Sequence, residues 1–131
     1  MKKLGKNSKI LVTGHKGLVG SAIVRRLKFF GYKKILTISK KKLNLENQEK
    51  VNNYFKKNKP DAVINASAYT AVDKAESDEE NAYLLNQTAV ANLAKYCKSN
   101  NVFFVHVSTD YVFNGEKGSP YTVDDAIEPQ G

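Results

Sequence analysis

The residues Ile10–Gly20 read ILVTGHKGLVG and join an apolar run to a glycine-rich turn. The apolar run ends at Thr13, and the glycines follow at the spacing G-x-x-G-x-x-G, as Gly14, Gly17 and Gly20. Apolar residues at helical spacing begin directly afterwards. A strand, a glycine turn and a helix in this order indicate a phosphate site, because a helix N-terminus offers free N–H groups and a favourable dipole. We predict that Gly14 permits the turn, Gly17 a close approach of phosphate, and Gly20 close packing of the helix against the sheet.

Strands and helices alternate along the rest of the chain. We predict strands at 9–13, 35–38, 62–65 and 102–107, and helices at 17–30, 46–58 and 78–98. The first strand is continuously apolar rather than alternating, as expected when helices cover both faces of a sheet, and the second is less uniformly apolar because Thr37 and Ser39 interrupt it. This pattern predicts an α/β fold, a Rossmann-type doubly wound parallel sheet with right-handed crossovers. With the phosphate loop after the first strand, we expect the strand order 3-2-1-4.

Length and composition fit one soluble domain over residues 1–131. The N-terminus, MKKLGKNSK, lacks the apolar core of a signal peptide, and no run approaches the ~18 apolar residues that cross a membrane. The single cysteine, Cys97, excludes an internal disulfide, and it has no histidine or cysteine at ligand spacing. We therefore expect a cytoplasmic protein with no membrane partner, no metal and a buried Cys97.

The formal net charge of +8 admits a nucleic-acid binder as one interpretation. The lysines, however, are dispersed over predicted loops and helix ends, with no aromatic residues between them on which bases could stack. We expect a solvated lysine-rich surface and no nucleic-acid partner. Part of the charge could still attract an anionic cofactor or a sugar nucleotide.

The end of the second predicted strand bears on the choice of dinucleotide. A site selective for NAD usually carries an acid there, which binds the ribose hydroxyls and repels a 2′-phosphate. Here Ser39 and Lys40 stand at that position, followed by two more lysines and no acid. Together with Lys16 in the glycine turn they favour NADP(H), with NAD(H) left open. Residues 41–42 are equally well a solvated turn, and Asn44 either contacts the adenine edge or begins the next helix.

Three segments carry a resemblance: GHKGLVGSAIVRRL, KPDAVINASAYTAVDKAE and HVSTDYVFNGEKGSPY. They resemble the dTDP-4-dehydrorhamnose reductase family of extended short-chain dehydrogenases/reductases, over residues 8–131. The first half, with GHKG and the LNL at 43–45, is also similar to GDP-L-fucose synthase. The resemblance implies an oxidoreductase that uses NADP(H) to reduce the nucleotide sugar dTDP-4-dehydrorhamnose to dTDP-L-rhamnose, a precursor of cell-surface polysaccharide. Residues 108–110 contain no cysteine, which favours simple reduction over the epimerisation and reduction of the fucose enzyme.

Candidate site residues follow from the glycine turn, the second strand and the resemblance. The residues predicted to bind the cofactor are Gly14, Lys16, Gly17, Leu18, Val19, Gly20, Ser39, Lys40, Asn44, Ala66, Ser67, Ala68 and Tyr69. By the resemblance, the hydroxyl of Thr109 is catalytic and hydrogen-bonds the substrate carbonyl oxygen as charge develops on it. The alternative is that Thr109 satisfies a loop backbone group. We expect His106 to lie in the core or an interface rather than to act as a base.

The resemblance also implies residues that this sequence does not contain. The family's general acid is a tyrosine with a lysine four positions later, and none of the seven tyrosines here has such a lysine. We therefore expect an N-terminal fragment that lacks the C-terminal substrate-binding part and does not turn over alone. Its apolar fourth strand should be an exposed edge.

Two questions stay open at this stage. A non-catalytic NADP-binding module, similar to the regulatory subunit of methionine adenosyltransferase, is the alternative to the reductase. A homodimer of the full-length protein is retained as an option.

Overall fold

The computed structural model describes residues 3–130, which form a parallel sheet flanked by helices. The strands are β1 (Lys9–Thr13), β2 (Lys34–Thr37), β3 (Ala62–Asn65) and β4 (Phe103–His106). The predicted fold class, a doubly wound parallel sheet of Rossmann type, is confirmed. The predicted strand order is wrong, because the sheet runs β2-β1-β3-β4.

The position of β1 explains the corrected order. Leu11 and Val12 are fully buried, so β1 lies at the centre of the sheet and pairs along both edges. The chain leaves β2, crosses over β1 and pairs β3 with the far edge of β1, Val12 opposite Ile64. Continuous apolar strands indicate burial on both faces, but they do not tell which edges pair.

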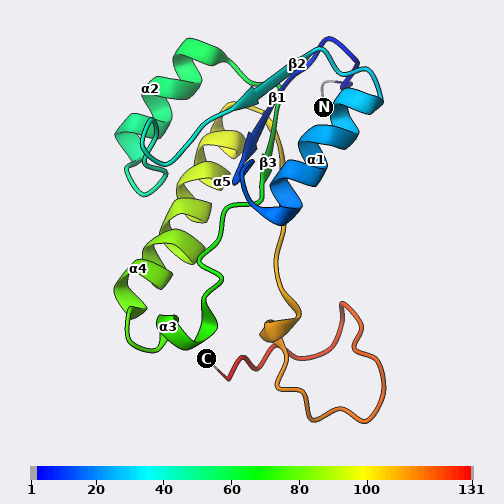
Figure 1. Ribbon diagram of the computed structural model, residues 1–131, viewed down its shortest axis with the longest axis vertical. Coiled ribbons are helices and arrows are strands. Elements are labelled where there is room, and N and C mark those ends of the chain that lie inside the picture. Colours follow the sequence, from blue (N-terminus) through cyan, green and yellow to red (C-terminus); the bar gives the residue numbers. More distant parts are fainter. Residues whose placement is uncertain (1–2, 131) are drawn as a thin grey trace.

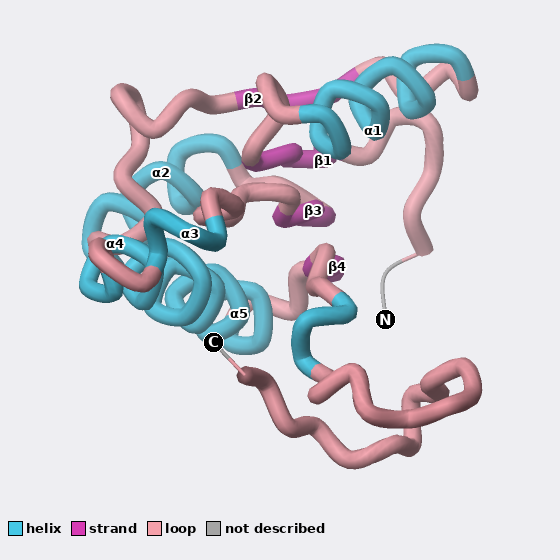
Figure 2. Tube along the Cα trace, turned by 60° about the horizontal axis from the view of Figure 1, so that its bottom comes forward, coloured by secondary structure: helices cyan, strands magenta, loops and turns pink. Residues whose placement is uncertain are grey.

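Helices cover both faces of the sheet, as Figures 1 and 2 show. α1 (Leu18–Phe29) packs on one face, and α2 (Gln48–Asn58) and α5 (Ala89–Ser99) pack on the other. In a right-handed crossover, the face of the sheet that the helix covers depends on whether the next strand is added on one side of the previous strand or on the other. The connection from β1 to β2 and the connection from β2 to β3 run in opposite directions, so the winding reverses between β1 and β3. Ligands of such sheets bind at this reversal, beyond the carboxyl ends of the strands.

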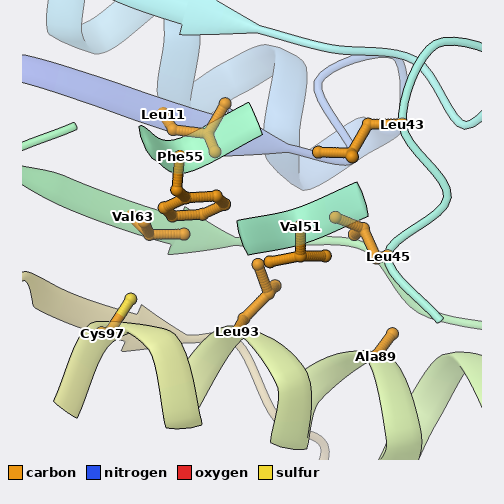
Figure 3. Packing of buried hydrophobic residues seen from close by; sticks show 9 residues of the cluster. All are labelled: Leu11, Leu43, Leu45, Val51, Phe55, Val63, Ala89, Leu93 and Cys97. Atoms are coloured by element: carbon orange, nitrogen blue, oxygen red, sulfur yellow. The ribbon is translucent and has the colours of Figure 1, made fainter. Parts of the chain in front are cut away.

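The larger core lies between the sheet and the pair α2 and α5 (Figure 3). Its buried members are Leu11, Leu43, Leu45, Val51, Phe55, Val63, Ala89, Leu93 and Cys97. Cys97 is buried as predicted, and this burial raises the pKa of its thiol to about 11. Leu43 and Leu45 bring the loop after β2 into this core, so that loop is anchored rather than free.

The single helix predicted at 78–98 is interrupted. The structure has α4 (Glu79–Tyr83), a π-helical turn over Leu84–Thr88, and then α5, preceded by a short unpredicted helix, α3 (Val72–Ala75). π-turns widen a helix by one residue and occur often at functional sites. Here the turn contains Asn86, which contacts the loop after β3.

The β4 edge is the most open part of the sheet. The register puts Phe103 and Val105 on the face that carries α1, and with Val107 they keep 41%, 39% and 38% of their surface exposed. This confirms the prediction of an exposed apolar fourth strand. Residues 107–130 are loop apart from a 3-10 turn at Asp110–Val112. Among residues 3–130, no helix is both long and apolar enough to span a bilayer.

Candidate dinucleotide-binding site

The glycine turn packs tightly against the end of β3. Gly14 has φ +66°, and a Cβ there would lie 2.3 Å from the carbonyl oxygen of Ala66. A Cβ on Gly20 would lie 2.2 Å from the carbonyl oxygen of Gly14. The predicted role of Gly14 in the turn is therefore confirmed, whereas the predicted role of Gly20 is wrong in its partner, because Gly20 packs against the turn itself rather than against the sheet.

The first turn of α1 is exposed, in contrast to the packing of Gly14 on Ala66. Gly17 is the N-cap, its N–H donates to the Gly14 carbonyl at 2.9 Å, and a Cβ there would meet only that carbonyl, at 3.3 Å. The side chains of Leu18 and Val19 are 87% and 46% exposed. The first-turn N–H groups have no partner within a helix, and this turn contains no acid, so the dipole favours an anion. Lys16 is exposed beside the turn and adds positive charge.

A buried polar group ties the strand ends together at the same edge. The Thr13 hydroxyl donates to Asn65 Oδ1 at 2.5 Å, and the Ser67 N–H donates to the same oxygen at 3.2 Å. Thr13 and Asn65 are each only 1% exposed. The Asn65 amide nitrogen lies 3.1 Å from His106 Nδ1, within hydrogen-bonding distance. Sequence reasoning missed this role of Asn65.

His106 differs from its prediction in burial. It is an exposed residue of β4 rather than a core residue, and its ring stacks at 6.4 Å on that of Phe104. Within the described part of the chain, β4 is the edge strand, and no further strand covers His106 at its end. The Nδ1 contact with Asn65 orients the ring toward the strand ends that hold the site.

The loop after β3 is held from two sides. The Asn86 side chain accepts from the Tyr69 N–H at 2.7 Å and donates to the Tyr69 carbonyl at 3.1 Å. The Tyr69 hydroxyl donates to Asp78 Oδ2 at 3.0 Å. This hydrogen bond, with desolvation and the charge of Asp78, raises the pKa of Tyr69. Ala66, Ser67, Ala68 and Tyr69 thus form a fixed segment next to the glycine turn.

The loop after β2 forms a second part of the site. A hollow of about 100 Å³ opens there, lined by Ile38, Lys40, Leu43, Asn44, Leu45, Glu46 and Leu85. Lys40 Nζ lies 3.1 Å from Glu46 Oε1. No acid follows β2 directly, as predicted, but the loop folds back and brings Glu46 to Lys40. Ser39 accepts the N–H groups of Lys42 and Leu43 with its carbonyl and shapes this return.

Thr109 follows β4 and is exposed. Its hydroxyl oxygen accepts the Tyr111 N–H at 3.2 Å and so caps the 3-10 turn, and the hydroxyl donates over a longer distance, 3.4 Å, to Asp110 Oδ1. This is the backbone-satisfying role that the sequence left open beside the catalytic one. A hydroxyl oxygen that accepts can still donate its hydrogen elsewhere, so the two roles are compatible.

Taken together, the strand ends form an elongated site. The glycine turn and residues 66–69 meet at the reversal between β1 and β3, and the hollow lined by Lys40 and Asn44 lies beyond β2. A doubly wound sheet with a glycine turn at the reversal defines a dinucleotide-binding domain of Rossmann type.

Comparison with known proteins gives the family. Residues 8–131 match the family described as RmlD substrate binding domain, and the chain belongs to it. It is 44% identical to a dTDP-4-dehydrorhamnose reductase of Burkholderia thailandensis over 121 residues, 92% of this chain and 40% of that protein. It is 38% identical to the spore coat polysaccharide biosynthesis protein SpsK of Bacillus subtilis over 123 residues, 94% of this chain and 43% of that protein.

Solved structures agree. The crystal structure of a dTDP-4-dehydrorhamnose reductase from Clostridium acetobutylicum superposes with a TM-score of 0.88 at 40% identity, over 93% of this chain and 43% of that one. The reductase of Bacillus anthracis, solved in complex with NADP, gives 0.87 at 28% identity, over 97% and 45%. The predicted resemblance is confirmed. This chain spans less than half the length of these relatives and corresponds to their N-terminal part.

Proposed function

We propose that this chain is the dinucleotide-binding part of an NADP(H)-dependent reductase that acts on a nucleotide 4-keto-6-deoxy sugar. The proposed reaction is the reduction of dTDP-4-dehydrorhamnose to dTDP-L-rhamnose, in the cytoplasm. Residues 1–131 would form the incomplete Rossmann domain. The observation that carries the proposal is the glycine turn, with Gly14 packed on Ala66 at the reversal of the sheet.

The residues present fit such a cofactor. The turn leaves no room for a Cβ on Gly14 or Gly20, and within residues 3–130 the start of α1 has no side-chain cap on its first N–H groups. A diphosphate would be held there by backbone donors and by the helix dipole. Lys16 and Lys40 supply positive charge on either side, and the walls would come from residues 66–69. The NADP complex of the Bacillus anthracis relative supports NADP(H) as the cofactor.

NADPH supplies a hydride to the substrate carbonyl carbon when it is bound. Thr109 would donate a hydrogen bond from Oγ1 to the carbonyl oxygen, where negative charge develops. Its oxygen already accepts from the Tyr111 N–H, and its hydrogen would turn from the long 3.4 Å contact with Asp110 Oδ1 to the substrate oxygen. The Tyr69 hydroxyl already donates to Asp78 Oδ2, so Tyr69 fits a wall of the site.

The test uses the protein encoded by the complete reading frame. We expect it to oxidise NADPH in the presence of dTDP-4-dehydrorhamnose. Thr109→Val should lower kcat about 10²-fold, as loss of one oxyanion donor does, and leave NADPH affinity unchanged. Ser108→Ala is the matched control and should keep kcat. Absence of turnover with this substrate, or an unaffected T109V variant, would refute the proposal.

The reductase is favoured over the regulatory module. The relatives named as dTDP-4-dehydrorhamnose reductases support it, and no observation on residues 3–130 favours the alternative.

A further inference from the structure

The ion pair between Lys40 and Glu46 bears directly on the cofactor's adenosine end. Lys40 keeps 67% of its side chain exposed, whereas Glu46 keeps 16%. The lysine can therefore move into solvent and toward a ligand, while the glutamate stays in place. Both line the hollow at the carboxyl end of β2, where acids of dinucleotide sites contact the ribose.

Glu46 is held by more than the lysine. Its second oxygen, Oε2, lies 3.3 Å from the Asn44 amide nitrogen, and its own N–H donates to Asn44 Oδ1 at 3.0 Å. From α5, Asn92 Nδ2 donates to the carbonyls of Leu45 and Glu46 at 3.0 and 2.9 Å. Leu43 and Leu45 are buried in the core, and all four residues from Leu43 to Glu46 line the hollow.

We propose that Glu46 is a specificity-determining residue that lowers the preference of this site for a 2′-phosphate. A 2′-phosphate that pairs with Lys40 must take that lysine from Glu46, and it then lies near a carboxylate that does not leave. A ribose 2′-hydroxyl neither breaks the ion pair nor brings a negative charge to the carboxylate, because a hydroxyl can donate a hydrogen bond to it. The inference rests on the proposed dinucleotide site and concerns only its adenosine end.

The experiment measures binding of two nucleotides that differ only in the 2′-phosphate. The 131-residue chain is titrated calorimetrically with 2′,5′-ADP and with 5′-AMP. Glu46→Gln keeps the size and the contact with Asn44 but removes the charge. We expect this substitution to increase the affinity for 2′,5′-ADP about three- to tenfold, the range for two like charges several ångströms apart near a surface. The affinity for 5′-AMP should stay within about twofold.

Two further variants complete the design. Glu49→Gln removes the same charge from an exposed position on α2 outside the hollow, and it should leave the ratio of the two affinities unchanged. Lys40→Gln changes an exposed side chain that folding does not require, and it should weaken 2′,5′-ADP while sparing 5′-AMP.

The outcomes separate the two proposals. Binding of both nucleotides with an unchanged ratio in E46Q, or an equal change in E49Q, would overturn the role of Glu46 and leave the dinucleotide site standing. Binding of neither nucleotide by the unmodified chain would overturn the dinucleotide site and this inference with it.

Discussion

The glycine turn and the loop after β2 form opposite ends of the candidate site. Backbone atoms form the first end, and side chains form the second. The turn is backbone packed on backbone, with no room for a Cβ on Gly14 or Gly20. The loop is a set of side chains around a hollow, in which an exposed Lys40 pairs with Glu46. The difference implies that the fold fixes where a diphosphate would lie, whereas substitutions can change what is recognised at the adenosine end.

The largest expected effect is at the turn. Gly20→Ala places a Cβ 2.2 Å from a carbonyl oxygen, so the helix must shift away from the turn. An alanine inside a helix is ordinarily stabilising by about 0.5–1 kcal/mol. Here we expect the free energy of unfolding to fall by about 3 kcal/mol or more, measured by urea denaturation. In Gly118→Ala, where nothing lies within 4 Å of the added Cβ, it should change little. Equal effects of the two substitutions would contradict the packed turn.

The next effect is at the polar group beneath the turn. Asn65→Ala leaves the Thr13 hydroxyl and the Ser67 N–H without their acceptor in a buried place. We expect a loss of about 2–3 kcal/mol in the free energy of unfolding. Asn100→Ala removes an exposed amide that donates to the Tyr96 carbonyl, and it should cost below about 1 kcal/mol. If both variants unfold at the same urea concentration, Asn65 does not tie the strands together.

A smaller effect is expected at the other end of the site. Asn92→Ala removes the two hydrogen bonds that hold the carbonyls of Leu45 and Glu46. The loss should be about 1–2 kcal/mol, one ordinary net contribution per bond. Amide hydrogen exchange should quicken in residues 39–47 and stay unchanged in residues 14–20. Uniform quickening across both segments would show that the two ends are not independent.

The smallest effect is electrostatic. The Tyr69 phenol donates to Asp78, and this hydrogen bond raises the Tyr69 pKa. Asp78→Asn removes the carboxylate charge, so the Tyr69 pKa should fall toward its ordinary value, as followed by carbon NMR of the tyrosine rings. Because the folded-state pKa is raised, the hydrogen bond stabilises the fold at neutral pH, and this contribution is lost as the pH rises through that pKa. An unchanged titration would remove Asp78 as the cause.

The glycine turn and much of the fold could be predicted from local sequence, and the predictions that were wrong have physical reasons. The glycine spacing predicts the turn because backbone geometry is a local property, and the strand at 62–65 is observed with the predicted bounds. The strand order and Glu46 depend on distant pairing. An acid six residues beyond Lys40 becomes its partner only because Leu43 and Leu45 bury and return the loop. The π-turn that presents Asn86 leaves no mark in the helical spacing of the apolar residues.

The most direct measurement is an NMR titration of the isotope-labelled 131-residue chain with NADPH. If the sheet reversal holds the cofactor, the largest amide shifts will fall in residues 14–20 and 66–69, followed by residues 39–46. Residues around Lys56 and Pro60, which line a separate hollow near the amino end of β3, serve as the internal reference and should not shift. Shifts centred on that hollow, or none in residues 14–20 at saturating NADPH, would contradict the dinucleotide site.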